Sequence, residues 1–125
     1  MLDQRLLPGR EEWLRCETPE EVATAIAEMA VRGAPAIGLA AAYGLALAVD
    51  EGERCAEERT VHLEEAAKTL SAARPTASNL AWALRRGLAA EDPLESARAL
   101  EREQLAADRA LSELGAERFQ AGDRA

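Results

Sequence analysis

Hydrophobic positions recur at helical spacing along most of the chain. Val22, Ile26 and Met29 mark one such face, and Leu80 and Leu84 mark another further along. Apolar residues three or four positions apart lie on one side of a helix, where a neighbouring element can bury them. This pattern predicts a mainly α fold, a bundle of about five helices.

Capping signals set the expected ends of these helices. Thr18-Pro19-Glu20-Glu21 and Asp92-Pro93-Leu94-Glu95 each combine a cap residue, a proline and an acid, so they predict helix starts at Pro19 and Pro93. Thr60 is the expected cap of the third helix. Helices are predicted over 19–31, 35–50, 61–73, from just after Thr76 to about 90, and over 93–115, with Gly115 as the last stop.

The chain is expected to form one domain over residues 1–125. Its 125 residues, 48% of them hydrophobic, suit a single core and are too few for two. Residues 1–17 show no clear period and are expected to form an irregular lead-in, while residues 116–125 form a polar tail. Glu51-Gly52 is expected to stop the second helix, whose many Ala and Gly residues make it the predicted centre of the bundle.

The charge and hydropathy of the chain narrow the classes of partner. The formal net charge is -8, so the phosphates of a nucleic acid would be repelled. The apolar run 34–49 is shorter than the roughly 20 residues that a bilayer requires, and residues 1–5 do not resemble a secretory signal. We therefore expect a cytoplasmic protein with no membrane partner, in which local arginines and N–H groups hold any anionic ligand.

Residue types that ligate metals or act as nucleophiles are few. Cys16 and Cys55 form no closely spaced pair, and His62 is the only histidine. A metal site needs several such ligands at short spacing, so no metal site is expected. We interpret the two thiols as buried or idle and His62 as a solvated surface residue.

The most informative motif is Arg32-Gly33-Ala34-Pro35-Ala36-Ile37-Gly38. A cation and a glycine turn lead directly into an apolar helix, whose first N–H groups and positive dipole end favour an anion such as phosphate. Arg32 can add a bidentate contact to that anion. The same pattern also suits a plain helix corner with a solvated arginine, and the residues alone leave both interpretations open.

A second motif, Arg74-Pro75-Thr76, separates the third and fourth predicted helices. Its proline rigidifies the chain, so Arg74 is held at a fixed angle, and Thr76 is able to cap the next helix. By itself the motif is more typical of an ordinary helix stop with a surface arginine. Asn79 either orients this corner or caps it locally.

In combination these motifs resemble the methylthioribose-1-phosphate isomerase family. The matching segments are Leu2 to Pro8, Val31 to Gly38, Ala40 to Gly44 and Arg74 to Leu80, and they span most of the chain. The resemblance implies the amino-terminal helical domain of an aldose-ketose isomerase of methionine salvage. That enzyme converts 5-methylthioribose 1-phosphate to 5-methylthioribulose 1-phosphate without a cofactor.

The same resemblance assigns roles to residues. Arg32, Gly33 and Ala34 would contact the sugar phosphate, and Arg74 would join them at its phosphate end. The family's catalytic cysteine and aspartate lie in a following α/β domain, and Gly122-Asp123-Arg124 is similar to the stretch just before that cysteine. We therefore expect no catalytic residue in this chain, no activity of the chain alone, and a homodimer for the full-length protein.

Two other functions stay open at this stage. The chain is similar to the related ribose 1,5-bisphosphate isomerases and to non-catalytic subunits of the translation-initiation nucleotide exchange factor. The residues of the two arginine motifs favour the methylthioribose branch. Leu111 and Leu114 are expected to expose apolar surface and so to cause self-association or disorder near the carboxyl end.

Overall fold

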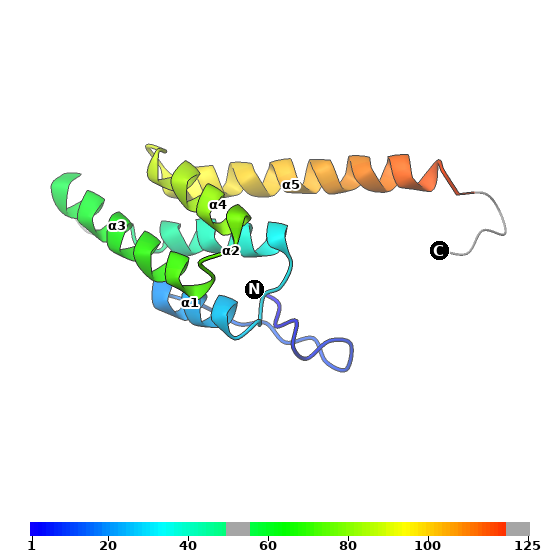
Figure 1. Ribbon diagram of the computed structural model, residues 1–125, viewed down its shortest axis with the longest axis horizontal. Helices are drawn as coiled ribbons and strands as arrows, with labels where there is room; N and C mark the ends of the chain where they lie inside the picture. The colour runs from blue at the N-terminus through cyan, green and yellow to red at the C-terminus, as the bar shows by residue number, and fades with distance from the viewer. Residues whose placement is uncertain (50–55, 120–125) are drawn as a thin grey trace.

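This computed structural model describes residues 1–49 and 56–119 of the chain. They contain five α-helices (Figure 1). Their bounds are Pro19–Ala27 for α1, Ala34–Ala46 for α2, Ala56–Ala73 for α3, Ser78–Leu88 for α4 and Pro93–Ala116 for α5. The mainly α bundle of about five helices that the hydrophobic pattern predicts is confirmed.

Helix α2 is the centre of the bundle, because it contacts each of the other four helices. In Figure 1 it lies between α1 on one side and α4 on the other. Small residues permit this, since a Cβ at Gly44 would lie 3.0 Å from the side chains of both Val22 and Leu70. Ala41 and Leu45 of the same helix are fully buried, so α2 is packed on more than one face.

The lead-in, residues 1–17, is an irregular loop that folds back on itself. Leu2 and Trp13 form an antiparallel bridge, and the N–H of Asp3 donates to the carbonyl of Glu12 over 2.8 Å. The N–H of Gln4 donates over 2.8 Å to the carbonyl of Ala30, just past α1. The start of the chain is thus attached to the loop between α1 and α2.

Helix α1 ends four residues earlier than predicted. The cap Thr18 accepts a hydrogen bond from the N–H of Glu21, as expected. However, Met29 has a φ of 61°, a left-handed value that ends the helix, and its side chain is 48% exposed. Apolar spacing placed Met29 on the buried face, but the chain turns before reaching it and buries Val31 instead.

Other predicted boundaries are also wrong. Helix α2 starts at Ala34, one residue before Pro35, and ends at Ala46, four residues before its predicted end at residue 50. Helix α3 starts at Ala56, so Thr60 lies inside it and is not its cap. The N-cap of α4 is Ala77, whose methyl side chain cannot accept a hydrogen bond, so Thr76 does not take that position. The predicted stop at Glu51-Gly52 lies outside the described residues, as do Asp50, Cys55 and Gly122-Asp123-Arg124.

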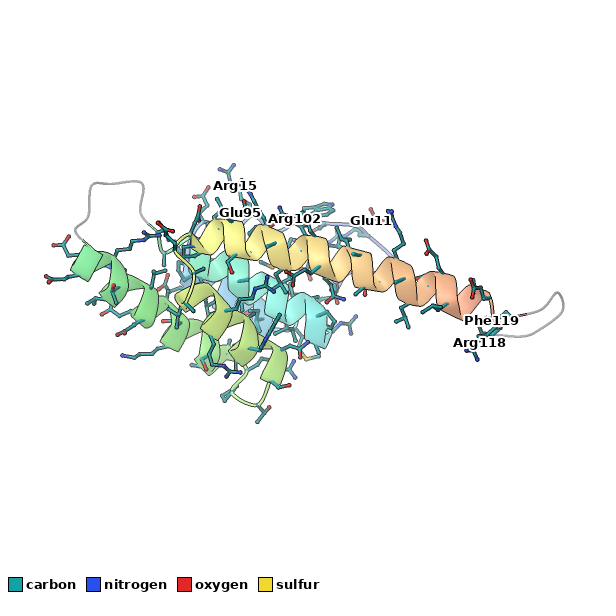
Figure 2. All side chains as sticks on the ribbon, turned by 90° about the horizontal axis from the view of Figure 1, so that it is seen from above. Glu11, Arg15, Glu95, Arg102, Arg118 and Phe119 are labelled. Atoms are coloured by element: carbon teal, nitrogen blue, oxygen red, sulfur yellow. The ribbon has the colours of Figure 1, made fainter. Side chains whose placement is uncertain are left out.

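Helix α5 is capped as predicted but is only partly covered. The carboxylate of Asp92 accepts from the N–H groups of Leu94 and Glu95. The buried residues of α5 end at Leu100, and the rest of the helix projects from the bundle (Figure 1). Figure 2 shows Arg102 over the bundle and Arg118 and Phe119 far beyond it. The helix continues through Gly115 to Ala116, so the glycine does not end it.

The projecting half exposes the leucines that the sequence assigned to an uncovered surface. Leu111 is 72% exposed and Leu114 is 62% exposed. None of the helices in the described residues is both long enough and apolar enough to cross a membrane.

Candidate functional site

The first turn of α2 is open to an anion. Gly33 is its N-cap, with a φ of 93°, and no side chain in the described part of the chain caps the helix. Ile37 donates its N–H to the Gly33 carbonyl over 2.9 Å, whereas the earlier N–H groups of Ala34 and Ala36 have no side-chain acceptor. Gly33 and Ala34 are exposed, so the positive end of the helix dipole is accessible.

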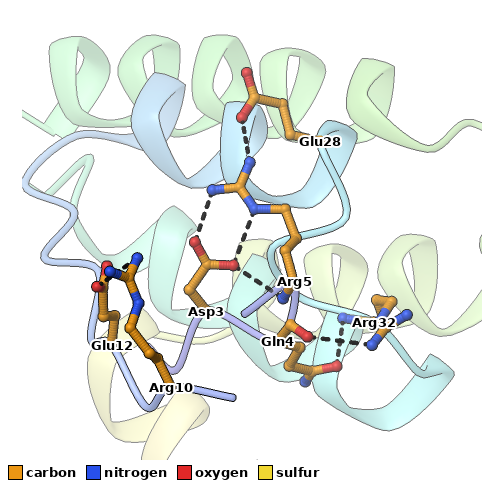
Figure 3. Close-up of polar contacts among 7 residues, drawn as sticks. All are labelled: Asp3, Gln4, Arg5, Arg10, Glu12, Glu28 and Arg32. Atoms are coloured by element: carbon orange, nitrogen blue, oxygen red, sulfur yellow. Dashed lines mark hydrogen bonds and ion pairs between the residues drawn. The ribbon is translucent and has the colours of Figure 1, made fainter. Parts of the chain in front are cut away.

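Arg32 is exposed beside this turn and is held by one residue of the lead-in (Figure 3). Its backbone N–H donates to Oε1 of Gln4, and its Nη2 donates to the backbone carbonyl of Gln4, both over 3.2 Å. One nitrogen of the guanidinium is therefore occupied by the protein itself. The remaining donors of its fork are left for a ligand.

A buried carboxylate anchors the lead-in next to this contact. Asp3 is only 3% exposed, and Arg5 donates to both of its carboxylate oxygens, from Nε over 2.9 Å and from Nη2 over 2.7 Å. Arg5 also donates from Nη1 to Glu28 over 2.7 Å (Figure 3). These hydrogen bonds lower the pKa of Asp3 and raise the pKa of Arg5.

This arrangement leaves a positive charge at the corner. The three carboxylates drawn in Figure 3 are each paired with an arginine other than Arg32, since Asp3 and Glu28 pair with Arg5 and Glu12 pairs with Arg10. Arg32 has no ion pair within residues 1–49 and 56–119. A cation without a carboxylate partner, next to open helix N–H groups, is suited to bind phosphate in a protein whose net charge is -8.

The helix that follows the second arginine motif, α4, meets α2 at Gly38, four residues after the start of α2. Arg74 is half-buried in the turn after α3, and its carbonyl accepts from the N–H of Ala77 over 3.0 Å. A Cβ at Gly38 would lie 3.1 Å from the backbone oxygen of Asn79. Gly38 thus lets the starts of α2 and α4 touch, and the turns that carry Arg32 and Arg74 lead into helices in direct contact.

Cys16 lines an apolar groove that reaches the corner. The groove has a volume of about 950 Å³, and its wall includes Gln4 and Ala36 as well as Leu39 and Tyr43. Burial raises the pKa of the Cys16 thiol. A thiol with a raised pKa is a poor nucleophile. His62 is on the exposed face of α3, 4.0 Å from Glu65. Within the described residues, no cluster of ligands suited to a metal ion is found.

Tyr43 ties the central helix to α5. Its hydroxyl donates to Oε2 of Glu101 over 2.5 Å, and burial, together with that carboxylate, raises the pKa of Tyr43.

The sequence indicated Tyr43 only as part of a motif, and it predicted no role for Gln4 or Asp3. The signal in the sequence was the polar Asp3-Gln4-Arg5 set between Leu2 and Leu6.

Comparison with known families and curated proteins gives a consistent result. Residues 30–124 match the model of the initiation factor 2 subunit family. Methylthioribose-1-phosphate isomerase of Anaeromyxobacter dehalogenans is 50% identical over 93% of this chain. The isomerase of Pseudomonas putida strain GB-1 is 56% identical over 69% of the chain. The chain spans 34% of the length of the first of these relatives and 24% of the second.

Two solved structures share the fold. The crystal structure of translation initiation factor eIF-2B, subunit delta, from A. fulgidus superposes with a TM-score of 0.88 and 39% identity, covering 98% of this chain and 40% of that one. The crystal structure of 5-methylthioribose 1-phosphate isomerase from Pyrococcus horikoshii gives a TM-score of 0.65 and 43% identity, covering 82% of this chain and 31% of that one.

Proposed function

Because this chain belongs to the initiation factor 2 subunit family and is a homologue of methylthioribose-1-phosphate isomerase, we propose that it supplies the phosphate-binding corner of an aldose-ketose isomerase. The observation that carries the proposal is the corner at Arg32, Gly33 and Ala34. There, among the described residues, a guanidinium without a carboxylate partner lies next to the start of α2, which no side chain caps.

The substrate we propose is 5-methylthioribose 1-phosphate, which the whole enzyme would convert to 5-methylthioribulose 1-phosphate. Arg32 and the N–H groups of the first turn of α2 bind the phosphate, and Arg74 approaches it from the start of α4. Opening a sugar ring and moving a proton between neighbouring carbons require a positioned acid and base. The corner offers donors and positive charge, so its part is binding, and the chain alone is expected to be inactive.

Calorimetric titration with 5-methylthioribose 1-phosphate tests the binding role. We expect the chain to bind the sugar phosphate, and Arg32→Ala to weaken binding by about ten- to a hundredfold, since hydrogen bonds to charged groups contribute about 1.5–3 kcal/mol. Arg10→Ala is the matched control, because its ion pair with Glu12 is exposed. Equal affinity of the two variants would contradict the proposal.

A coupled isomerase assay tests the division of labour. It is run with the 125-residue chain and with a version extended through the family's cysteine and aspartate domain. We expect turnover only in the extended version. Turnover by the 125-residue chain would contradict a role limited to binding.

A second candidate function is a non-catalytic regulatory subunit. The superposition on eIF-2B, subunit delta, covers 98% of this chain, which supports it. In that case the same helices would serve as an interaction surface. An extended version that binds the sugar phosphate and never isomerises it would favour this function.

A further inference from the structure

Gln4 is the one residue of the lead-in with hydrogen bonds to both the backbone and the guanidinium of Arg32 among the described residues. Its side-chain oxygen accepts from the Arg32 N–H, and its backbone carbonyl accepts from Nη2 (Figure 3). The first contact fixes the peptide that enters Gly33. The second limits the directions in which the guanidinium can point.

The residue that makes these contacts is itself fixed. The N–H of Gln4 donates to the carbonyl of Ala30 over 2.8 Å. On either side of it in sequence, Asp3 is buried and Arg5 is bonded to both Asp3 and Glu28. Gln4 is thus a rigid support, because its two neighbours and its own backbone are anchored independently of Arg32.

We propose that Gln4 is a positioning residue, which holds Arg32 in the orientation that binds the phosphate of the substrate. The inference rests on the proposed function of the corner. A free arginine has many rotamers, and a ligand that binds it must order them. Gln4 orders the side chain in advance and leaves the rest of the guanidinium fork free, which lowers the entropic cost of binding.

The size of the effect follows from the contact that can be removed. Gln4→Met keeps the length of the side chain and the backbone carbonyl that holds the guanidinium, but it removes the Oε1 acceptor that fixes the Arg32 peptide. Losing a neutral hydrogen bond of this kind reduces affinity by about three- to tenfold. We therefore expect Gln4→Met to weaken binding of 5-methylthioribose 1-phosphate by about three- to tenfold.

A double-mutant cycle distinguishes positioning from general loss of structure. Binding is measured by calorimetry for the wild-type chain, Gln4→Met, Arg32→Ala and the double variant. If Gln4 acts through Arg32, the loss caused by Gln4→Met disappears when Arg32 is already alanine. Gln104→Met is the matched control, since that glutamine bonds only Asp108 among the described residues, on the distant α5. The thermal midpoint of each variant shows that it is folded.

The outcomes separate the two proposals. No binding by the wild-type chain overturns the proposed function and the role of Gln4 with it. Wild-type affinity in Gln4→Met, or an equal loss in the Arg32→Ala background, overturns the role of Gln4 alone. If Gln4→Met does not fold, hydrogen exchange of the wild-type chain decides: the Arg32 amide must exchange more slowly than the Ala34 amide, which has no side-chain acceptor.

Discussion

Asp3 is a carboxylate in an unusual place, buried near the start of the chain and satisfied by a single arginine. Arg5 supplies two side-chain hydrogen bonds and one from its backbone N–H, which donates to Oδ1 over 3.0 Å. A buried charge without such a partner would be strongly unfavourable. The pair therefore fixes the ionised form of Asp3 in the folded state, and the fold depends on pH through it.

Acid should weaken the fold through this residue. The pKa of Asp3 is lowered by its hydrogen bond with Arg5, whereas the unfolded chain returns it to about 3.8. The stabilisation is therefore present above the unfolded pKa and is lost as pH falls through the lower folded value. Urea unfolding of wild type and Asp3→Asn at pH 7, 5 and 3 should show a stability difference that shrinks only at the lowest pH.

The control for this series is Glu12→Gln, which removes a carboxylate from an exposed ion pair with Arg10. Exposed pairs contribute little, so this variant should match wild type at each pH. A difference between wild type and Asp3→Asn that stays constant down to pH 3 would mean that the Asp3-Arg5 pair does not form.

Individual residues also show which parts of the site could be predicted from the sequence and which could not. Gly33 was predictable, because an arginine and a glycine before an apolar helix indicate a turn that needs a positive φ. The role of Gly38 was not, since it depends on Asn79 lying 3.1 Å from its Cβ position. Likewise, Gln4 and Arg32 are 28 positions apart in the sequence, and they meet only because the lead-in folds back toward the start of α2.

At the scale of elements, the two capping patterns that begin α1 and α5 were correctly predicted. Each of these caps acts within three residues of sequence, so local chemistry decides it. The wrong boundaries have a different cause. Helix α1 ends early at Ala27, before the left-handed Met29, and α3 starts four residues before Thr60, so packing and loop geometry override the local preference there.

The caps themselves can be compared by mutation. Asp92→Ala removes an acceptor for two N–H groups of α5 and should lower the free energy of unfolding by about 1 kcal/mol. Thr76→Ala should leave it unchanged, because Ala77 is the N-cap of α4. Both values come from urea unfolding monitored by circular dichroism. Equal losses in the two variants would mean that Thr76 caps α4 after all.

At the scale of the whole molecule, the projecting half of α5 carries an uncovered apolar surface. Leu111 and Leu114 lie on the stripe that is buried further back at Ala97 and Leu100. An apolar stripe that continues past the helices it packs against favours contact with another apolar surface. This exposure was predicted from the sequence, because the apolar stripe continues past the helices that could cover it.

We expect the chain to self-associate through this surface. The double variant Leu111→Gln and Leu114→Gln should sediment as a smaller species than wild type at the same concentration in analytical ultracentrifugation. Leu88→Gln, which changes an exposed leucine at the end of α4, is the control and should behave as wild type. A wild-type chain that remains monomeric with an ordered carboxyl end would contradict the expectation.

The early end of burial in α5 also bears on how the protein is made. The last buried side chain among the described residues is that of Leu100, so the described core is complete in sequence once the ribosome has added that position. Domains commonly fold during synthesis, amino-terminal parts first. The bundle and its arginine corner can therefore close once Leu100 has left the ribosome, and the later turns of α5 are not needed for that step.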